Sequence, residues 1–213
     1  MEATMSIRIL SVPGYKGSGE QHWQTWLEPQ LNNCQRIDTI DWNRPILHNW
    51  VKEIVRAIDS RPEKVLLIAH SFGCLATAMA AEQRPGMVTG IILVAPADPQ
   101  RFGLFGHKET EGGQSIASFL PETLAIPGVL VASRNDPWML FRHAWAWSKR
   151  WNLTFIDAGE AGHINVESGH GPWPLIRLIT DSVIDSIRHR QQGKPAQLSY
   201  PLFSQQAVRM SYL

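Results

Sequence analysis

Ala69-His70-Ser71-Phe72-Gly73 decides the fold of this chain, because it joins a short apolar run, Val65–Ile68, to an alanine-rich segment. The run is typical of a buried strand and the segment of a helix. At a tight strand-to-helix turn the central residue is held in a strained conformation, and its side chain projects clear of the sheet. The sequence therefore predicts an accessible hydroxyl at Ser71. The alternative is that Ser71 only caps the following helix.

Around this turn, β-branched runs alternate with longer amphipathic stretches, which is typical of parallel strands joined by crossover helices. Strands are expected at Ser6–Val12, Arg36–Asp41, Lys64–His70, Val88–Ala95, Gly128–Ser133 and Leu153–Asp157. Helices are expected at Gln21–Leu31, Ile46–Ser60, Phe72–Gln83, Trp138–Trp151 and Leu175–Arg190. The pattern predicts an α/β fold with about six mostly parallel strands, and the last helix is expected to pack on a face of the sheet.

The composition is that of an ordinary folded protein, with 213 residues, 44% hydrophobic and 18% charged. Its 20 basic and 19 acidic residues leave no basic field for nucleic acid and no polybasic segment for a membrane surface. The partner is expected to be a small molecule. The two cysteines, Cys34 and Cys74, fit no zinc or redox spacing and are interpreted as reduced and structural.

The length suits one domain, expected over residues 1–190. From Gln191 onward the chain has no hydrophobic period, which indicates a C-terminal tail over 191–213 that is mobile or lies on a neighbour. The first residues carry no basic stretch, and Ile7–Val12 is too short for a signal or a membrane span. A cytoplasmic location is the expectation.

Two further loops carry the residue types that a nucleophilic serine needs as partners. A serine attacks well only when a base takes its proton and an acid orients that base. In α/β-hydrolases the chain order is nucleophile, acid, histidine, each after a strand. Here Ser71, Asp136 and His163 follow the third, fifth and sixth expected strands in that order. They are predicted to meet at one edge of the sheet.

Competing residues exist for the acid and for the base. Asp98 also follows a strand end and could orient His163 in place of Asp136, although Asp136 is favoured. His170 lies farther from its strand end than His163 does. His70 is adjacent to Ser71, and neighbouring residues at a strand end project to opposite sides, so His70 is interpreted as a packed histidine under the turn.

The oxyanion of an acyl-transfer intermediate needs preset backbone N–H donors. One is expected from Phe72, the residue after the nucleophile. The second is expected from the glycine-rich loop over residues 13–19, with Tyr15 preferred and Lys16 behind it. The same loop matches no phosphate-binding pattern, because its glycines have the wrong spacing and Glu20 stands where a lysine is needed.

No metal or other cofactor is predicted. His107, Glu109 and Glu111 alternate in a polar loop, which indicates solvated charge more than a metal site. That loop, Arg101–Ser118, is irregular and follows a strand end, where a substrate loop would be useful.

The chain has 9 tryptophans. Trp42, Trp138 and Trp173 border the expected site, and aromatic walls suit an apolar acyl or alkyl group, so these three are predicted to bind substrate. Core packing is at least as good an explanation for Trp145, Trp147 and Trp151.

Taken together, the motifs resemble a family, the small α/β-hydrolases of the retinoblastoma-binding protein 9 and YdeN type. The motifs that carry the resemblance are Val12-Pro13-Gly14-Tyr15, Gly17-Ser18, His22-Trp23, Asp41-Trp42, His70-Ser71-Phe72-Gly73-Cys74, Asn135-Asp136-Pro137, Gly162-His163-Ile164-Asn165, Ser168-Gly169 and Trp173. The resemblance implies a compact, six-stranded, three-layer α/β-hydrolase fold without a separate cap domain. It also implies a triad of Ser71, Asp136 and His163.

The expected activity is hydrolysis of small or medium carboxylic esters through an acyl-enzyme at Ser71, with thioesters and amides less favoured. A second hypothesis is a protein-binding module that keeps the fold without catalysis. The sequence leaves open the acyl chain, the leaving group, the oligomeric state and any physiological partner.

Overall fold

A six-stranded parallel sheet forms the centre of the computed structural model, which describes residues 7–108 and 113–193. Every neighbouring pair of strands in this sheet is parallel. In order across the sheet the strands are β2 (Cys34–Arg36), β1 (Arg8–Val12), β3 (Val65–His70), β4 (Val88–Val94), β7 (Gly128–Ala132) and β8 (Thr154–Asp157). The carboxyl ends of these strands therefore lie along one edge, where parallel α/β sheets place their ligands.

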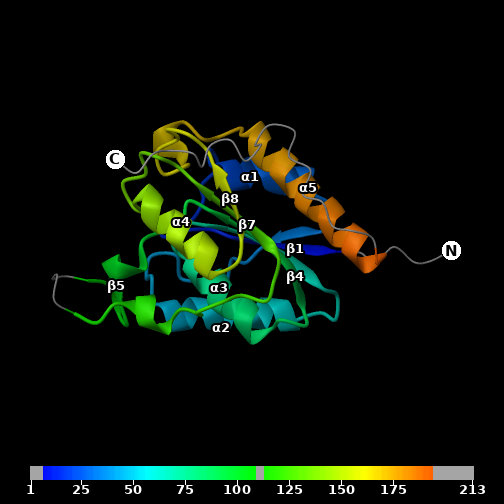
Figure 1. Ribbon diagram of the computed structural model, residues 1–213, viewed down its shortest axis with the longest axis horizontal. Helices are drawn as coiled ribbons and strands as arrows, with labels where there is room; N and C mark the ends of the chain where they lie inside the picture. The colour runs from blue at the N-terminus through cyan, green and yellow to red at the C-terminus, as the bar shows by residue number, and fades with distance from the viewer. Residues whose placement is uncertain (1–6, 109–112, 194–213) are drawn as a thin grey trace. The chain divides into compact units, whose positions relative to one another are not determined.

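Helices cover both faces of this sheet, as expected for parallel strands that are buried on both sides. Figure 1 shows α2 (Leu47–Asp59) and α3 (Phe72–Gln83) side by side on one face and α1 (Trp23–Leu27) on the other. Alternate residues of β1, Leu10 and Val12, join the core on the α2 and α3 face. The three-layer α/β arrangement predicted from the sequence is confirmed.

Helix α3 is buried along most of its length, because it is nearly all small or apolar residues. It begins immediately after β3 and lies very close to β1. A Cβ atom at Gly73 would stand 2.4 Å from the Pro13 carbonyl oxygen, a distance that no side chain tolerates. The glycine lets α3 start here and so fixes the position of Ser71 at the sheet edge.

The contacts divide the chain into two compact units, one ending at Trp173 and one beginning at Pro174. The second unit contains α5 (Pro174–Gln191), which matches the helix predicted at Leu175–Arg190. Of the predicted tail, residues from 194 onward lie outside the described residues. No helix in the described part of the chain is long and apolar enough to cross a membrane.

The second strand is where the sequence prediction fails. β2 ends at Arg36, whereas the predicted strand began there. Ile37 and Ile40 are buried from a loop instead, at 4% exposure each. Their burial explains the misleading pattern, since these β-branched residues fill the core from a loop. The Ile37 N–H still donates to the Ser11 carbonyl of β1 at 3.0 Å, but the strand does not continue beyond it.

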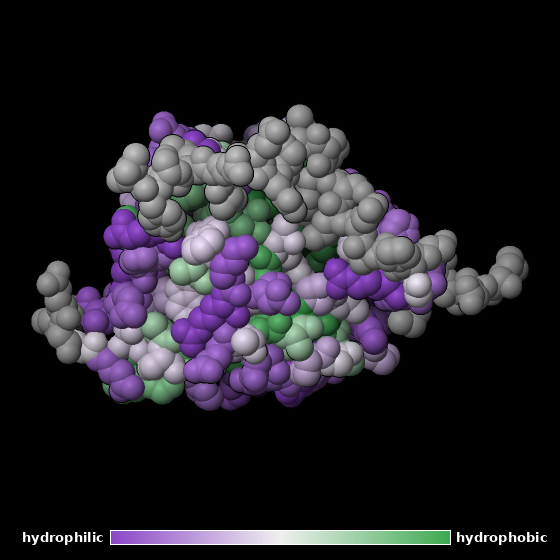
Figure 2. All heavy atoms as spheres, viewed as in Figure 1, coloured by the Kyte–Doolittle hydropathy of each residue, from purple (hydrophilic) through white to green (hydrophobic). Residues whose placement is uncertain are grey.

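Two helices differ from the prediction by more than one residue at an end. The helix expected over Gln21–Leu31 divides into α1 and a 3-10 turn, Glu28–Gln30, because Pro29 lacks the N–H that an α-helix needs. α4 (Phe141–Arg150) begins three residues later than predicted. Figure 2 shows hydrophilic and hydrophobic residues mixed on the face of the molecule that includes α4. The exposed residues of α4 include Arg142, Lys149 and Arg150 but also Trp145.

A small hairpin lies between β4 and β7 and was not predicted. It consists of β5 (Phe102–Gly103) and β6 (Gly106–His107), which pair antiparallel. The 3-10 turns Pro99–Arg101 and Ile116–Phe119 flank it, and the described residues between β4 and β7 contain no α-helix. The edge of the sheet is therefore covered here by a hairpin of two-residue strands.

Candidate active site

Ser71 occupies the strained turn between β3 and α3. Its backbone has φ 53° and ψ −124°, in the left-handed half of the map that residues with a side chain rarely adopt. Its N–H donates to the Val94 carbonyl at 3.1 Å, which ties the turn to β4. The hydroxyl makes no capping hydrogen bond to α3 and lies 2.8 Å from His163 Nε2. The helix-cap interpretation of Ser71 is therefore wrong.

His163 links this hydroxyl to Asp136. Its Nδ1 lies 2.9 Å from both oxygens of the Asp136 carboxylate. An ionised carboxylate only accepts hydrogen bonds, so Nδ1 carries the proton and Nε2 is free to accept from Ser71. The Trp138 amide donates to Asp136 Oδ1 at 2.8 Å and fixes the carboxylate. The three side chains form one continuous hydrogen-bonded chain and are each at most 9% exposed as residues.

The competing acid and base have other partners. Asp98 accepts from the Gln100 amide and contacts His143 Nδ1 at 3.2 Å, on the outer side of α4. His170 packs edge-on against Trp173 and lies within hydrogen-bond distance of Ser168. Neither residue is hydrogen-bonded to Ser71, His163 or Asp136 in the described part of the chain. The structure therefore brings together the three residues that the sequence favoured.

The segment that carries the base, Ala161–Ile164, is held by side chains at every residue; we call it the base loop. The loop needs this support because Gly162 and Ile164 both have positive φ, 57° and 48°. From the loop carrying Asp136, Ser133 Oγ accepts from the Ala161 N–H and Asn135 Oδ1 from the Gly162 N–H. The carbonyls of the other two residues accept hydrogen bonds: His163 O lies 3.0 Å from His70 Nε2, and Ile164 O lies 2.9 Å from Trp23 Nε1.

His70 was predicted as a packed histidine, and its hydrogen bond to the base loop was missed. A carbonyl only accepts, so His70 Nε2 carries a proton and donates. Burial, together with the nearby His163 and His22, lowers the pKa of His70 well below its usual value. His70 is therefore a neutral donor that joins the β3 strand to the backbone of the base. Only the fold reveals this contact, because 93 residues separate the two positions.

His22 packs edge-on against His70, with ring centroids 4.8 Å apart. Its Nδ1 accepts from the Gln24 amide at the start of α1. Burial is the main cause that lowers the pKa of His22, to about 4, with the charges of Arg36 and His163 adding to it. Both histidines beneath the site are thus uncharged at neutral pH.

The predicted oxyanion donors lie beside Ser71. Phe72 is the first residue of α3, so its N–H has no partner within the helix. Among the described residues, neither the Phe72 nor the Tyr15 amide donates to another backbone group. The Lys16 amide instead donates to the Trp42 carbonyl at 2.9 Å. Tyr15 is therefore the better placed of the two loop candidates.

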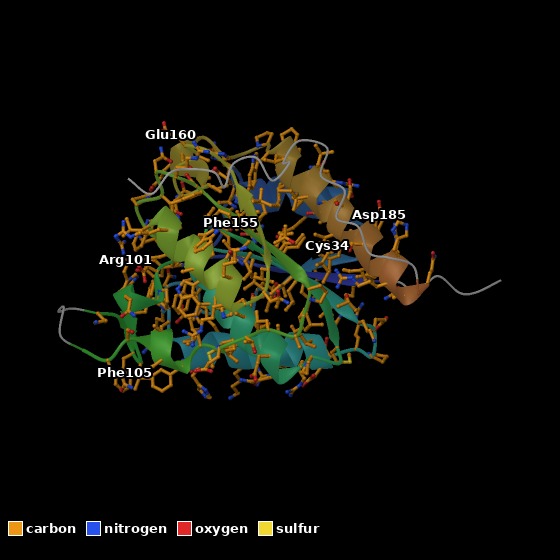
Figure 3. The ribbon with its side chains drawn as sticks, viewed as in Figure 1. Cys34, Arg101, Phe105, Phe155, Glu160 and Asp185 are labelled. Carbon is orange, nitrogen blue, oxygen red and sulfur yellow. The ribbon has the colours of Figure 1, made fainter. Side chains whose placement is uncertain are left out.

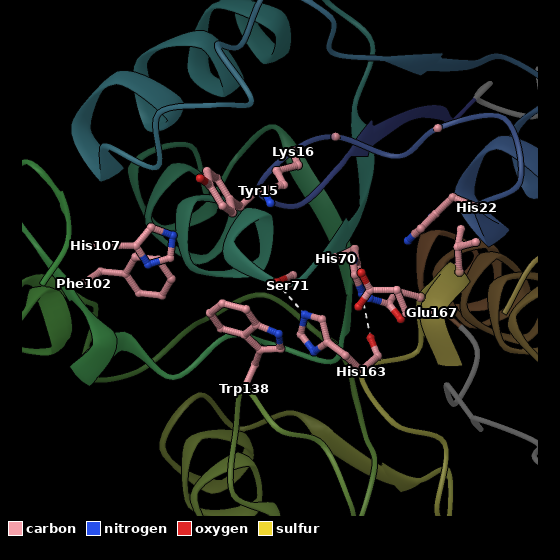
Figure 4. Close-up of a pocket in the computed structure, with 14 residues that line it drawn as sticks. Tyr15, Lys16, His22, His70, Ser71, Phe102, His107, Trp138, His163 and Glu167 are labelled. Atoms are coloured by element: carbon pink, nitrogen blue, oxygen red, sulfur yellow. Dashed lines mark hydrogen bonds between the residues drawn. The ribbon is translucent and has the colours of Figure 1, made fainter. Parts of the chain in front are cut away.

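A pocket of about 300 Å³ opens over Ser71 and His163 (Figure 4). Of the three tryptophans predicted to bind substrate, Trp138 lines it. Trp42 instead packs against Trp50, at 5.4 Å between ring centroids, and Trp173 packs against Trp23 at 5.7 Å. Trp42 and Trp173 therefore do not line this pocket, and the structure assigns their rings to packing beside it.

The described residues hold no group of three or more histidine, cysteine or acidic side chains that could bind a metal ion. Of the metal alternative considered from the sequence, Glu109 and Glu111 lie outside the described residues. Burial raises the pKa of Cys34 to about 12 and that of Cys74 well above its usual value. Both are free thiols and remain protonated at neutral pH.

Comparison with known proteins agrees with this geometry. The sequence model of the serine hydrolase family matches residues 9–181, which include Ser71, Asp136 and His163. The chain belongs to this family. A solved YdeN-like hydrolase from Pectobacterium atrosepticum is 34% identical, with a TM-score of 0.72 over 84% of this chain and 92% of that one.

More distant relatives support the same assignment. The hydrolase YdeN of Bacillus subtilis (strain 168) is 23% identical over 178 residues, which cover 81% of this chain and 93% of YdeN. The solved structure of Est1E from Butyrivibrio proteoclasticus is 14% identical and has a TM-score of 0.60, covering 92% of each chain. At that identity Est1E shows the shared fold alone. The serine hydrolase is thus an enzyme with the YdeN-like α/β-hydrolase fold.

Proposed function

We propose that this serine hydrolase cleaves carboxylic esters of small molecules through an acyl-enzyme at Ser71. The observation that carries the proposal is the continuous hydrogen-bonded chain from Ser71 Oγ through His163 to the Asp136 carboxylate, with both steps below 3 Å. Its members come from three separate strand ends. This is the arrangement that acyl transfer by serine requires.

In the first half-reaction Ser71 Oγ attacks the ester carbonyl carbon while its proton passes to His163 Nε2. Asp136 stabilises the imidazolium that forms and remains ionised. The N–H groups of Phe72 and Tyr15 donate to the oxyanion. Collapse of the intermediate breaks the bond to the alcohol oxygen, which takes the proton from His163. Water then attacks the acyl-enzyme in the same way and releases the acid.

The pocket sets the size of the substrate. A volume of about 300 Å³ is at the lower end of the range for ligand pockets, roughly 300–1,000 Å³. Small or medium acyl groups fit this space, whereas long acyl chains need a larger cavity. A series of p-nitrophenyl esters of increasing chain length should therefore show highest activity for the short acyl groups.

Labelling with a fluorophosphonate tests the nucleophile. We expect the probe to modify Ser71 in the folded protein and hydrolysis of p-nitrophenyl acetate to be measurable. Ser71→Ala should abolish labelling and lower kcat by at least about a thousandfold. Ser118→Ala, which removes an exposed hydroxyl, is the matched control. Wild-type activity in folded Ser71→Ala would refute the proposal.

A further inference from the structure

The hairpin of β5 and β6 contributes two side chains to the pocket. Phe102 and His107, which pair across the two strands, both line the cavity. The tip points the other way, and Figure 3 shows Phe105 at the outer edge of the molecule. A segment that turns two rings inward from the sheet edge is placed to contact the substrate.

The rings form a set of flat walls at one end of the pocket. The His107 ring centroid lies 4.8 Å from that of Tyr15, 4.7 Å from Phe102 and 6.1 Å from Trp138. Figure 4 shows these side chains on one side of Ser71. Edge and face contacts of this kind favour a planar group over a bulky aliphatic one.

Two cations lie against these rings. Lys16 itself lines the pocket, whereas Arg101 is an exposed residue that contacts Trp138, a ring of the pocket wall. Lys16 Nζ lies 5.6 Å from the Tyr15 ring centroid, and the Arg101 guanidinium lies 4.9 Å from the Trp138 ring centroid. Among the residues that the structure describes, the Arg101 guanidinium donates one hydrogen bond, to the Pro137 carbonyl, out of the five that it can make. Within residues 7–108 and 113–193, neither cation forms an ion pair with a carboxylate.

His107 lies near enough to both cations to be affected by their charges. Burial lowers the pKa of His107, and the nearby charges of Arg101 and then Lys16 lower it further. The imidazole is therefore neutral at neutral pH and carries one N–H donor. Neither ring nitrogen has a hydrogen-bond partner in the part of the chain that the structure describes.

The opposite end of the pocket has the opposite charge. Glu167 lines the cavity near His22, and Figure 4 places it across Ser71 and His163 from His107. An anionic substrate group is repelled from the Glu167 end and attracted to the end with Lys16 and Arg101. The two ends together give the substrate one preferred orientation.

We propose that the end of the pocket formed by Tyr15, Phe102, His107 and Trp138 binds a planar group that carries an anion, with Lys16 and Arg101 as the residues that select the charge. The preferred substrates are then esters with a flat, carboxylate-bearing group next to the bond that is cleaved. This inference rests on the proposed esterase activity and specifies its substrate class.

Two matched pairs of esters test the proposal. Monomethyl terephthalate and methyl 4-carbamoylbenzoate differ only by carboxylate against amide in the acyl part. The pair 4-acetoxybenzoate and 4-acetoxybenzamide makes the same change in the leaving group. We expect kcat/KM to favour the charged member of at least one pair by about tenfold at low ionic strength, and 0.5 M NaCl to reduce the preference.

Lys16→Met and Arg101→Met should each reduce this preference by about threefold, as expected for one partly exposed charge, and the double variant should remove it. Lys149→Met and Arg150→Met are matched controls, because these cations lie at the same 5.6 Å and 4.9 Å from the rings of Trp145 and Trp147. Both are on α4, and the rings that they contact do not line the pocket, whereas Tyr15 and Trp138 do. The controls should leave the preference unchanged.

The outcomes separate this inference from the proposed function. If all four esters are cleaved without charge preference, or if the preference survives in the double variant, the anion subsite is refuted and the esterase stands. If no ester is cleaved and the fluorophosphonate does not label Ser71, the proposed function itself fails. A preference that is lost only in the Lys16 and Arg101 variants supports the inference.

Discussion

The base loop and the β5–β6 hairpin border the same pocket but are held in different ways. Every residue of the base loop has a backbone group bonded to a side chain from another element. The hairpin is held mainly by ring contacts of Phe102 and His107, and its tip is exposed, 51% at Leu104 and 91% at Phe105.

This difference matches what each region must do. Proton transfer needs heavy atoms within about 3 Å in a defined direction, and hydrogen bonds supply that direction. Ring contacts are less directional and tolerate substitution better. We therefore infer that changes at the base loop reduce the rate of the chemical step, whereas changes at the hairpin alter substrate choice.

The largest expected effect is at Asp136, the acid that orients the histidine of the base loop. Asp136→Asn replaces an acceptor of the His163 Nδ1 proton with an amide that also donates, so the imidazole loses its productive tautomer. We expect kcat for p-nitrophenyl acetate to fall by about 10⁴-fold. Asp98→Asn is the matched control and should change kcat by less than about threefold, since Asp98 contacts His143 instead. A larger loss of kcat in Asp98→Asn than in Asp136→Asn would mean that Asp98, and not Asp136, orients the base.

The next effect is a pH dependence of the free energy of unfolding, caused by the buried His22. Because the pKa of His22 falls to about 4 in the folded protein, below the usual 6.5, the unfolded chain binds a proton that the folded chain excludes between these values. The stability is therefore complete above pH 6.5 and falls as the pH drops toward 4, by on the order of 3 kcal/mol for this group.

His22→Asn tests this linkage, because asparagine can still accept from the Gln24 amide but does not titrate. Urea unfolding at several pH values should show a slope smaller by roughly 1.4 kcal/mol per pH unit within that window. The buried His70 adds a dependence of the same sign, so some slope remains. His48→Asn, at an exposed position of α2, should leave the slope as it is. An unchanged slope in His22→Asn would contradict the buried, neutral state of His22.

A smaller effect is expected at His70, which positions the base without touching the substrate's reacting atoms. His70→Ala leaves the His163 carbonyl buried without its donor, and a small displacement of the base is enough to lower kcat by about 10- to 100-fold. KM should change little. His70→Gln keeps an N–H donor at a similar reach and should restore most of kcat. If both variants lose kcat equally, the hydrogen bond is not what matters.

Much of this could be predicted from the sequence because the signals are local. The run before Ala69 and the small residues around Ser71 specify a strand, a turn and a helix within one short segment. Asp136 and His163 follow strand ends, and in a parallel sheet all such ends share one edge. The chain order of three loops was therefore enough to bring these residues together.

The contacts that were missed depend on residues far apart in the chain. His70 reaches a carbonyl 93 residues away, and Trp23 one 141 residues away. No spacing rule connects such pairs. Position in the sequence also does not separate a pocket wall from packing beside it: Trp138 lines the pocket, whereas Trp42 and Trp173 do not. The hairpin has only two residues in each strand, too few for a periodic pattern.

The smallest expected effect is at Phe105, at the tip of the β5–β6 hairpin. Phe105→Ser removes a ring that is 91% exposed and contributes little buried surface. We expect the free energy of unfolding to change by less than about 0.5 kcal/mol and kcat to stay unchanged. Phe102→Ser, only 1% exposed in the same hairpin, should destabilise the protein by several-fold more. Equal effects of the two substitutions would mean that the inward rings do not hold the hairpin against the pocket, and its role in choosing the substrate would lose its structural basis.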